Sequence, residues 1–323
     1  MAVQIAVIDD WQDVAREVVD WSVLDSIGQV TFVHDFPADR DTLAERLQRF
    51  EVICVMRERT VFDEGLLRRL PNLKLLLTGG MRNAALDLKT AAELGIQVCG
   101  TDSYKHAAPE LTWALIMALT RNLVQEANAL RAGLWQQGLG GDLHGKTLAI
   151  LGLGSIGTRV AQFGQVFGMR VIAWSQNLTA EKAAEAGVTY VSKQALFEQA
   201  DILSVHLVLS ERTRGLVDAQ ALGWMKPGAL LVNTARGPIV DESALVEALQ
   251  HRRLAGAALD VFTQEPLPSD HPFRTLDNVL ATPHVGYVSR QNYQQFYSLM
   301  IEDLLAWAGG KPIRLLTAAP GVL

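Results

Sequence analysis

Short, continuous apolar runs that alternate with amphipathic stretches constrain the fold of this chain more than any other feature. In residues 3–100 the stretches DTLAERLQRF and DEGLLRRL are among those that separate the runs QIAVIDD, VTFVHD, VICVM, LKLLLTG and IQVCG. Strands that are apolar throughout are typical of a parallel sheet covered by helices on both faces. The sequence therefore predicts an α/β fold, with a flavodoxin-like layer in the first hundred residues.

A second strand–helix series follows a glycine-rich break at residues 138–145. Its apolar runs are TLAILGL, RVIAWS, DILSVHL, ALLVNTA, GAALDV and NVLATPH. One long helix is predicted between the two series, over residues 108–132. The tail from about Asn292 holds a helix and the segment KPIRLL, which could return to complete the first domain. For a chain of 323 residues, two domains are a better expectation than one core.

Composition excludes several classes of function. A net charge of −6 argues against nucleic acid as the main partner. The start MAVQIAVIDD lacks the basic stretch of a secretory signal, and the apolar run LTWALIMALT is about half of a membrane span. We therefore expect a cytoplasmic protein that does not bind membranes. Cys54 and Cys99 are expected to be core thiols, with a disulfide left open as the alternative.

A glycine turn, GLGSIG at residues 152–157, ends one apolar run and opens a helical pattern. In such a turn Gly152 would allow the tight bend, Gly154 the approach of a pyrophosphate, and Gly157 close packing of helix on strand. The unpaired N–H groups of a helix N-terminus favour an anion there. Because the turn lies between a strand and a helix, it predicts a dinucleotide, although the six-residue pattern alone is weak.

The end of the next strand usually selects between NAD and NADP. An acidic residue there would bind the ribose hydroxyl and repel a 2′-phosphate. This chain has Trp174, Ser175, Gln176 and Asn177, which include neither an acid nor an arginine. Ser175 could bond a ribose hydroxyl or a phosphate, so both cofactors remain open, with NAD favoured.

Three short strings, NTARG, QEPLP and TPHVG, place Arg236, Glu265 and His284 after successive apolar runs. A guanidinium can clamp a carboxylate with two bonds and polarise a neighbouring carbonyl. An imidazole can give a proton to a keto oxygen and take it back in the reverse reaction. A carboxylate beside that imidazole would fix its tautomer. A surface salt bridge for Arg236 and an exposed loop acid for Glu265 are the alternative interpretations.

The other histidines are weaker candidates. His206, at the end of DILSVHL, is the main competitor as a base, and a packed core residue is its alternative role. His106 and Glu110 have a spacing that a metal could use, but capping or polar packing is the better interpretation, and no metal is predicted. The remaining four are expected to be solvated or to lie in a loop: His34, His144, His251 and His271.

Together these motifs resemble the D-isomer-specific 2-hydroxyacid dehydrogenase family, from about Val52 to Lys311. The resemblance includes GLGSIG, HLVLSERTRGLV, MKPGALLVNTARGPIVDESALVEAL, AGAALDVFTQEPLP and NVLATPHVGY. It implies two domains with parallel sheets around a cleft. A flavodoxin-like substrate domain would comprise residues 1–100 and 291–323, and a Rossmann NAD(P)-binding domain residues 101–290.

The resemblance also implies roles for individual residues. The family's catalytic arginine, glutamate and histidine fall on Arg236, Glu265 and His284. Its acidic residue near the nicotinamide carboxamide falls on Asp260. The other implied cofactor contacts are the backbone amides of Ser155 and Ile156 at the pyrophosphate, and Thr234 and Ala235 beside the catalytic arginine.

The segment TGGMRNAALD (78–87) resembles the family's loop for the substrate carboxylate. Typical members have a second glycine where this chain has Arg82. The backbone amides of Met81 and Arg82 would then bind the carboxylate. Arg57 and Arg59 lie where some relatives bring basic groups to the substrate, and surface charge is the alternative role for both.

The activity implied is hydride transfer between NAD(P)H and a small 2-keto acid or (R)-2-hydroxy acid. A catalytically weak dinucleotide-sensing scaffold of the corepressor type is the main alternative, since such a protein shares the fold and the same residues. Family members are commonly homodimers, with the LTWALIMALTRN helix and the segment around Trp135 near the interface.

Overall fold

The computed structural model describes residues 2–35 and 39–317. The chain divides into two compact units, which are described separately. Unit 1 comprises Met1–Tyr104 and Val288–Leu323, and unit 2 comprises Lys105–Tyr287. The C-terminal segment thus belongs with the N-terminal part of the chain.

Unit 1 contains a five-stranded sheet in the order β2-β1-β3-β4-β5. All neighbouring pairs of these strands are parallel. This order confirms the flavodoxin-like layer, and every apolar run predicted as a strand supplies one. The strands are β1 (Val3–Val7), β2 (Gly28–Phe32), β3 (Val52–Val55), β4 (Leu75–Thr78) and β5 (Gln97–Gly100).

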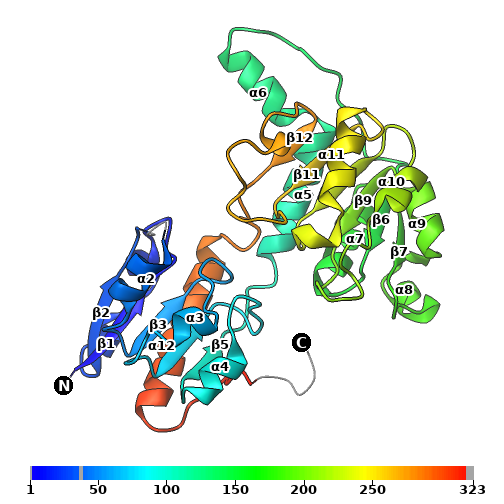
Figure 1. Cartoon of the computed structure of the whole chain (residues 1–323). Helices are drawn as coiled ribbons and strands as arrows, with labels where there is room; N and C mark the ends of the chain where they lie inside the picture. Colours follow the sequence, from blue (N-terminus) through cyan, green and yellow to red (C-terminus); the bar gives the residue numbers. More distant parts are fainter. Residues whose placement is uncertain (1, 36–38, 318–323) are drawn as a thin grey trace. The chain divides into compact units, whose positions relative to one another are not determined.

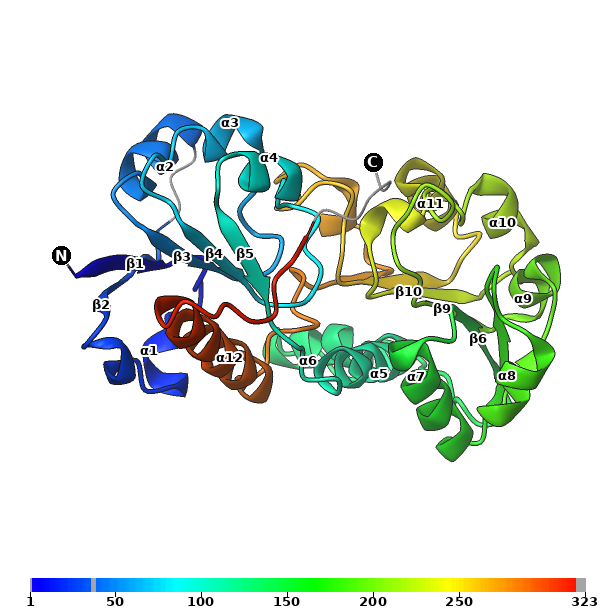
Figure 2. The same cartoon turned by 90° about the horizontal axis from the view of Figure 1, so that it is seen from below.

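Helices lie on both faces of this sheet, as Figure 2 shows. One face carries α2 (Arg40–Leu47), α3 (Glu64–Leu67) and α4 (Leu88–Glu93), and the other carries α1 (Ala15–Val18) and α12 (Arg290–Ala308), with the short 3-10 helix η1 (Ser22–Leu24) following α1. The first three begin with an aspartate whose side chain accepts a backbone N–H of the first turn. After α12, Leu315 forms an antiparallel bridge with Cys99, so the tail extends the sheet beyond β5.

Unit 2 contains a seven-stranded sheet in the order β12-β11-β10-β9-β6-β7-β8, again parallel throughout. The order reverses between β6 and β9, as in a Rossmann fold. The edge strand β8 was not predicted, because it has only two residues and both are exposed. The strands are β6 (Thr147–Leu151), β7 (Arg170–Trp174), β8 (Thr189–Tyr190), β9 (Ile202–Val205), β10 (Leu230–Asn233), β11 (Gly256–Leu259) and β12 (Val279–Ala281).

The helices of unit 2 cover this sheet on two sides (Figures 1 and 2). α5 and α7 pack together against one face, while α10 packs between α9 and α11 on the other. The α-helices are α5 (Ala107–Thr120), α6 (Leu123–Arg131), α7 (Ser155–Val166), α8 (Ala180–Glu185), α9 (Lys193–Gln199), α10 (Ala219–Trp224) and α11 (Glu242–Gln250), and two 3-10 helices are η2 (Gly237–Ile239) and η3 (Pro272–Arg274).

The prediction of one helix over residues 108–132 is wrong. The structure has α5 and α6 instead, with a break at Arg121 and Asn122. Asn122 has φ 52°, in the left-handed region that ends a right-handed helix. Asparagine tolerates this conformation better than most residues, because its short polar side chain can bond locally.

Cys54 and Cys99 are both buried free thiols in unit 1, as expected for core residues. Burial raises the pKa of each thiol to about 12, so both stay protonated and unreactive at neutral pH. Among the described residues, no helix combines the length and apolar character needed to cross a membrane.

Candidate active site

The glycine turn follows β6 at the point where the strand order reverses. Gly152 has φ 103°, and a Cβ there would lie 2.9 Å from the carbonyl of His206 after β9. A Cβ on Gly157 would lie 2.1 Å from the oxygen of Gly152, so only glycine lets α7 approach the turn. A Cβ on Gly154 would meet no atom within 4 Å. Gly152 and Gly157 are therefore packed closely against backbone atoms, whereas the space beside Gly154 is open. A pyrophosphate would approach the helix N-terminus there.

The end of β7 lies beside this turn, because the N–H of Gly152 donates to Trp174 O at 3.0 Å. Ser175, directly after Trp174, is half-buried, whereas Gln176 and Asn177 are exposed. A ribose-selecting carboxylate is absent from this segment of the sequence. The fit with a dinucleotide thus rests on the turn and the helix, and Ser175 offers a hydroxyl where selection between cofactors usually occurs.

Arg236 follows β10 in a loop that its neighbours hold tightly. Asn233 at the end of the strand donates to Arg236 O at 3.0 Å and accepts the N–H of Ala235 at 3.0 Å. A Cβ on Gly237 would lie 2.1 Å from the carbonyl carbon of Phe262, so this loop packs directly on the loop after β11. Sequence reasoning missed Asn233 and Gly237, although both lie within the NTARG string that drew attention to Arg236.

Glu265 and His284 form the closest polar pair of the site. Oε2 of Glu265 lies 2.6 Å from Nδ1 of His284, and Oε1 accepts the N–H of Phe262 at 2.9 Å. Because a carboxylate only accepts, Nδ1 carries the hydrogen of this bond and Nε2 faces away from Glu265. The His284 side chain is 21% exposed, which leaves its ring reachable from solvent.

Asp260, after β11, holds the loop that carries His284. Its carboxylate accepts the Thr282 hydroxyl at 2.6 Å and the N–H groups of Val285 and Gly286 at 2.8 and 2.7 Å. Burial raises the pKa of Asp260, with the Thr282 and backbone hydrogen bonds acting in the opposite direction. The loop bends sharply here, since His284 has φ 53°. This anchoring role was not foreseen, because it depends on a contact between two strand ends.

Thr234 and Ala235 lie where the Arg236 loop leaves β10. The hydroxyl of Thr234 lies 2.7 Å from that of Thr112 on α5. Ser155 and Ile156 begin α7 and are exposed, as a pyrophosphate contact requires. The sequence-predicted residues of unit 2 are thus all at the carboxyl ends of its strands or at the start of α7.

His206 is a poor competitor for the role of base. Its Nε2 lies 2.8 Å from the hydroxyl of Ser204. Desolvation by burial lowers the pKa of His206 to about 3, so the ring is neutral at physiological pH. His206 is partly buried, and its contact with Ser204 fits the alternative role of a packed residue better than the role of a base.

Two histidines expected to be solvated are instead engaged. His271 caps η3, lies 3.3 Å from Glu242 and has a side chain only 15% exposed. His34 lies beside Asp13, at 3.2 Å. The polar sequence around each histidine does not indicate these contacts, because the partner residues lie far away along the chain. His106 precedes α5, and its Nδ1 lies 3.2 Å from Arg159.

In unit 1, the loop after β4 has the features of an anion-binding turn. Gly80 has φ 98°, and its N–H donates to the Thr101 hydroxyl at 3.1 Å. Within the part of the chain that the structure describes, the N–H groups of Met81 and Arg82 donate to no protein acceptor. Nη1 of Arg57 lies 3.4 Å from Gly79 O, so its guanidinium covers the glycine pair.

Arg59 has a different environment from Arg57. Its guanidinium donates to the backbone oxygen of Asp9 and, at 2.9 Å, to the Tyr293 hydroxyl on α12. It also lies 4.5 Å from the centre of the Trp11 ring. These contacts give Arg59 a structural role within unit 1.

A Rossmann sheet with an open glycine at its switch point, together with an imidazole–carboxylate pair at its carboxyl edge, indicates a nicotinamide-dependent oxidoreductase. The model of the D-isomer specific 2-hydroxyacid dehydrogenase NAD binding domain matches residues 113–286. The chain belongs to the D-isomer-specific 2-hydroxyacid dehydrogenase family.

Individual relatives agree with this family. A glyoxylate reductase from Aeropyrum pernix is 38% identical over 285 residues, which is 85% of each chain. The crystal structure of a phosphoglycerate oxidoreductase from Vibrio cholerae is 40% identical, with a TM-score of 0.91 over 95% of this chain and 99% of that one. A D-lactate dehydrogenase from Aquifex aeolicus, complexed with NAD and lactic acid, is 25% identical, with a TM-score of 0.80 over 98% and 99%.

The protein is therefore an NAD(P)-dependent oxidoreductase that acts on the CH–OH group of D-2-hydroxy acids and, in reverse, on 2-keto acids. The relatives described above are enzymes, which supports hydride transfer over a dinucleotide-sensing scaffold. Its substrates are small hydroxy or keto acids.

Proposed function

We propose that this enzyme reduces small 2-keto acids of the glyoxylate and hydroxypyruvate type, with His284 as proton donor. The observation that carries the proposal is the 2.6 Å contact between His284 Nδ1 and Glu265 Oε2, with Glu265 itself held by the N–H of Phe262. This arrangement leaves Nε2 of His284 for the substrate oxygen. Similarity to the Aeropyrum glyoxylate reductase supports a small keto acid as the substrate.

Arg236, His284 and Glu265 each have a separate role in the reaction. Arg236 binds the substrate carboxylate and polarises the keto group, since a guanidinium offers several parallel donors. His284 gives its Nε2 proton to the keto oxygen in reduction and takes it back in oxidation. Glu265 keeps the ring in one orientation and stabilises the positive charge that the ring carries before it donates.

Cofactor contacts come from unit 2. Gly152, Gly154 and Gly157 shape the turn for a pyrophosphate, which the amides of Ser155 and Ile156 would bind. Thr234 and Ala235 line the nicotinamide side, the buried Asp260 lies near the nicotinamide carboxamide and supports this side from behind, and Ser175 binds the ribose end. When bound, the nicotinamide supplies or accepts the hydride. NAD is favoured over NADP, although Ser175 does not repel a phosphate.

Substrate contacts in unit 1 are the amides of Met81 and Arg82 and the guanidinium of Arg57. Two donors without protein partners suit a carboxylate, and Arg57 adds a positive charge beside them. Arg82 replaces a glycine of the family pattern, so its exposed side chain is the first place to look for substrate preference.

The enzyme would act as a homodimer in the cytoplasm, without a nucleic-acid or membrane partner. Support for the dimer comes from α6 and the segment that follows it, which stand away from the sheet of unit 2 in Figure 1. Exposed apolar side chains there would be covered by a second copy: Leu123, Val124, Leu130, Leu134, Trp135 and Leu139.

A panel of 2-keto acids assayed with NADH and NADPH side by side tests the proposal. We expect turnover of glyoxylate or hydroxypyruvate above that of bulkier or branched keto acids. If phenyl-substituted pyruvates are much better substrates, the small-substrate proposal is wrong. Tight dinucleotide binding without turnover of any acid in the panel would favour the sensing scaffold instead.

A further inference from the structure

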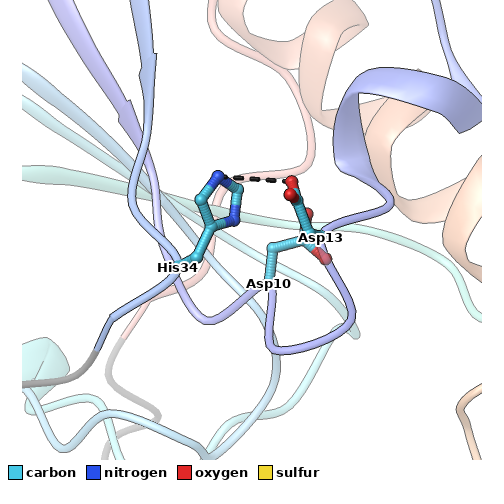
Figure 3. Close-up of side chains that lie close together, drawn as sticks. All are labelled: Asp10, Asp13 and His34. Atoms are coloured by element: carbon cyan, nitrogen blue, oxygen red, sulfur yellow. Dashed lines mark ion pairs between the residues drawn. The ribbon is translucent and has the colours of Figure 1, made fainter.

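Three side chains of types that can ligate a metal ion converge in unit 1, and none of them has an assigned catalytic role. Figure 3 shows Asp10 and Asp13, from the loop between β1 and α1, beside His34, which follows β2. One ligand atom from each residue lies within 4.8 Å of the other two. Because β1 and β2 are parallel neighbours, their carboxyl ends bring these loops together.

Asp10 is the residue that points to a ligand. Its side chain is fully buried, and Oδ2 accepts the N–H of Ala15 at the start of α1, at 2.7 Å. Its Oδ1 is also buried but has no hydrogen-bond partner among the described residues. A buried carboxylate oxygen without a partner costs free energy, and a bound cation is one way to satisfy it.

His34 and Asp13 complete the set. Nε2 of His34 lies 3.2 Å from Oδ1 of Asp13. Neighbouring ligands around a zinc-like ion, with bonds of about 2.0–2.2 Å, lie roughly 3–3.5 Å apart, so this spacing already fits. The Asp13 side chain is 64% exposed, so it has room to adjust around an ion.

The donor set selects the kind of ion. Two carboxylates neutralise a divalent charge, while an imidazole nitrogen disfavours calcium and magnesium, which prefer oxygen ligands throughout. We propose that Asp10, Asp13 and His34 form a binding site for a divalent transition-metal ion, such as Mn²⁺ or Zn²⁺. The ion ties the β1–α1 loop to the end of β2.

Mn²⁺ binding by the untagged full chain tests the site without reference to activity. Protein freed of metal with a chelator is titrated with Mn²⁺, and free Mn²⁺ is measured by electron paramagnetic resonance. We expect one ion per chain that Zn²⁺ displaces. His34→Gln and Asp13→Asn should each weaken binding at least about tenfold, or about 1.4 kcal/mol.

Two matched variants control for general loss of a histidine or an acid. His144→Gln changes an exposed loop histidine, and Asp35→Asn changes an exposed acid next to His34 that pairs with Arg46. Both should bind Mn²⁺ like the wild type. Equal loss in the control and ligand variants, or wild-type affinity in His34→Gln, overturns the proposal, as does an absence of binding at millimolar Mn²⁺.

Thermal unfolding gives an independent readout. Mn²⁺ should raise the Tm of the wild type but not that of His34→Gln, because an ion that binds only the folded state stabilises it. Asp10→Asn is informative only if its circular dichroism matches the wild type, since Asp10 also accepts the N–H of Ala15 at the start of α1. The variants His34→Gln and Asp13→Asn therefore decide the outcome even if Asp10→Asn does not fold.

Discussion

Nδ1 of His284 lies 2.6 Å from Oε2 of Glu265, and the other oxygen of this carboxylate is held by the N–H of Phe262 at 2.9 Å. The imidazole is therefore oriented by a side chain that is itself oriented by the backbone. Such a chain of contacts fixes which ring nitrogen faces the substrate.

Replacing His284 by alanine should lower kcat for keto-acid reduction by roughly 10²–10⁴-fold, because the proton donor is lost. Steady-state oxidation of NADH with glyoxylate measures the loss. NADH binding, followed by fluorescence, should change little. His251→Ala, at an exposed histidine after α11, is the control and should keep wild-type turnover. Near-normal turnover of His284→Ala would remove this residue from the mechanism.

Replacing Glu265 by glutamine should keep the contact with Phe262 but remove the charge beside His284. The carboxylate that orients Nδ1 of His284 is then lost, so kcat for keto-acid reduction should fall about tenfold or more. Steady-state kcat and KM with glyoxylate measure the loss. Glu247→Gln removes an exposed carboxylate from α11 and should keep wild-type turnover. Near-normal kcat in Glu265→Gln would break the proposed coupling.

The glycine turn predicts opposite effects for two similar substitutions. Gly154→Ala adds a Cβ into open space, so stability should be kept while the KM for the cofactor rises. Gly157→Ala places a Cβ 2.1 Å from the oxygen of Gly152, so the free energy of unfolding should fall. Urea unfolding and cofactor titration of both variants separate the effects. Equal stability of the two variants would contradict these glycine roles.

Ser175→Asp should increase the preference for NADH over NADPH at least about tenfold, since a carboxylate repels the 2′-phosphate. The ratio of kcat/KM for the two cofactors is the measurement. Ser243→Asp adds the same charge on the exposed face of α11, and its ratio should match the wild type. If both variants change the ratio alike, Ser175 does not contact the ribose end.

His206 should make stability depend on pH. Burial lowers its pKa from 6.5 to about 3. Below pH 6.5 the unfolded chain therefore binds a proton at this histidine that the folded chain does not bind. The stability that the neutral ring contributes is present above pH 6.5 and is lost as the pH falls towards 3. At pH 5, relative to pH 7.5, this costs about 1–2 kcal/mol.

Urea unfolding at the two pH values, in the wild type and in His206→Gln, measures this effect. The variant should lose less stability between pH 7.5 and pH 5 than the wild type. An identical loss in both proteins would show that His206 titrates normally in the folded state.

Much of the architecture could be predicted because parallel strands buried on both faces leave continuous apolar runs in the sequence. The strands from β1 to β7 and from β9 to β12 were recognised in this way, whereas β8 was not, since Thr189 and Tyr190 are exposed. The break at Asn122 was also missed. It depends on one left-handed residue, without a glycine or proline to mark it.

The residues of the site also divide into those that the sequence predicts and those that only the fold brings together. Arg236, Glu265 and His284 stand out because each polar residue directly follows an apolar run. The anchoring by Asp260, the contact of Gly237 with Phe262, and the meeting of Asp10 with His34 all depend on which strands are neighbours. That information appears only when the sheet order is known.

The three hydrogen bonds of Asp260 have a consequence for how this enzyme can diversify. A catalytic group on a loop usually shares the loop's mobility. Here the loop that carries His284 is bonded to the fully buried carboxylate of Asp260, and the backbone N–H of Asp260 donates to Asn233 O at 3.0 Å. The position of the imidazole is therefore set by the ends of β10 and β11, so surface segments around it can change in length and sequence while the proton donor keeps its place.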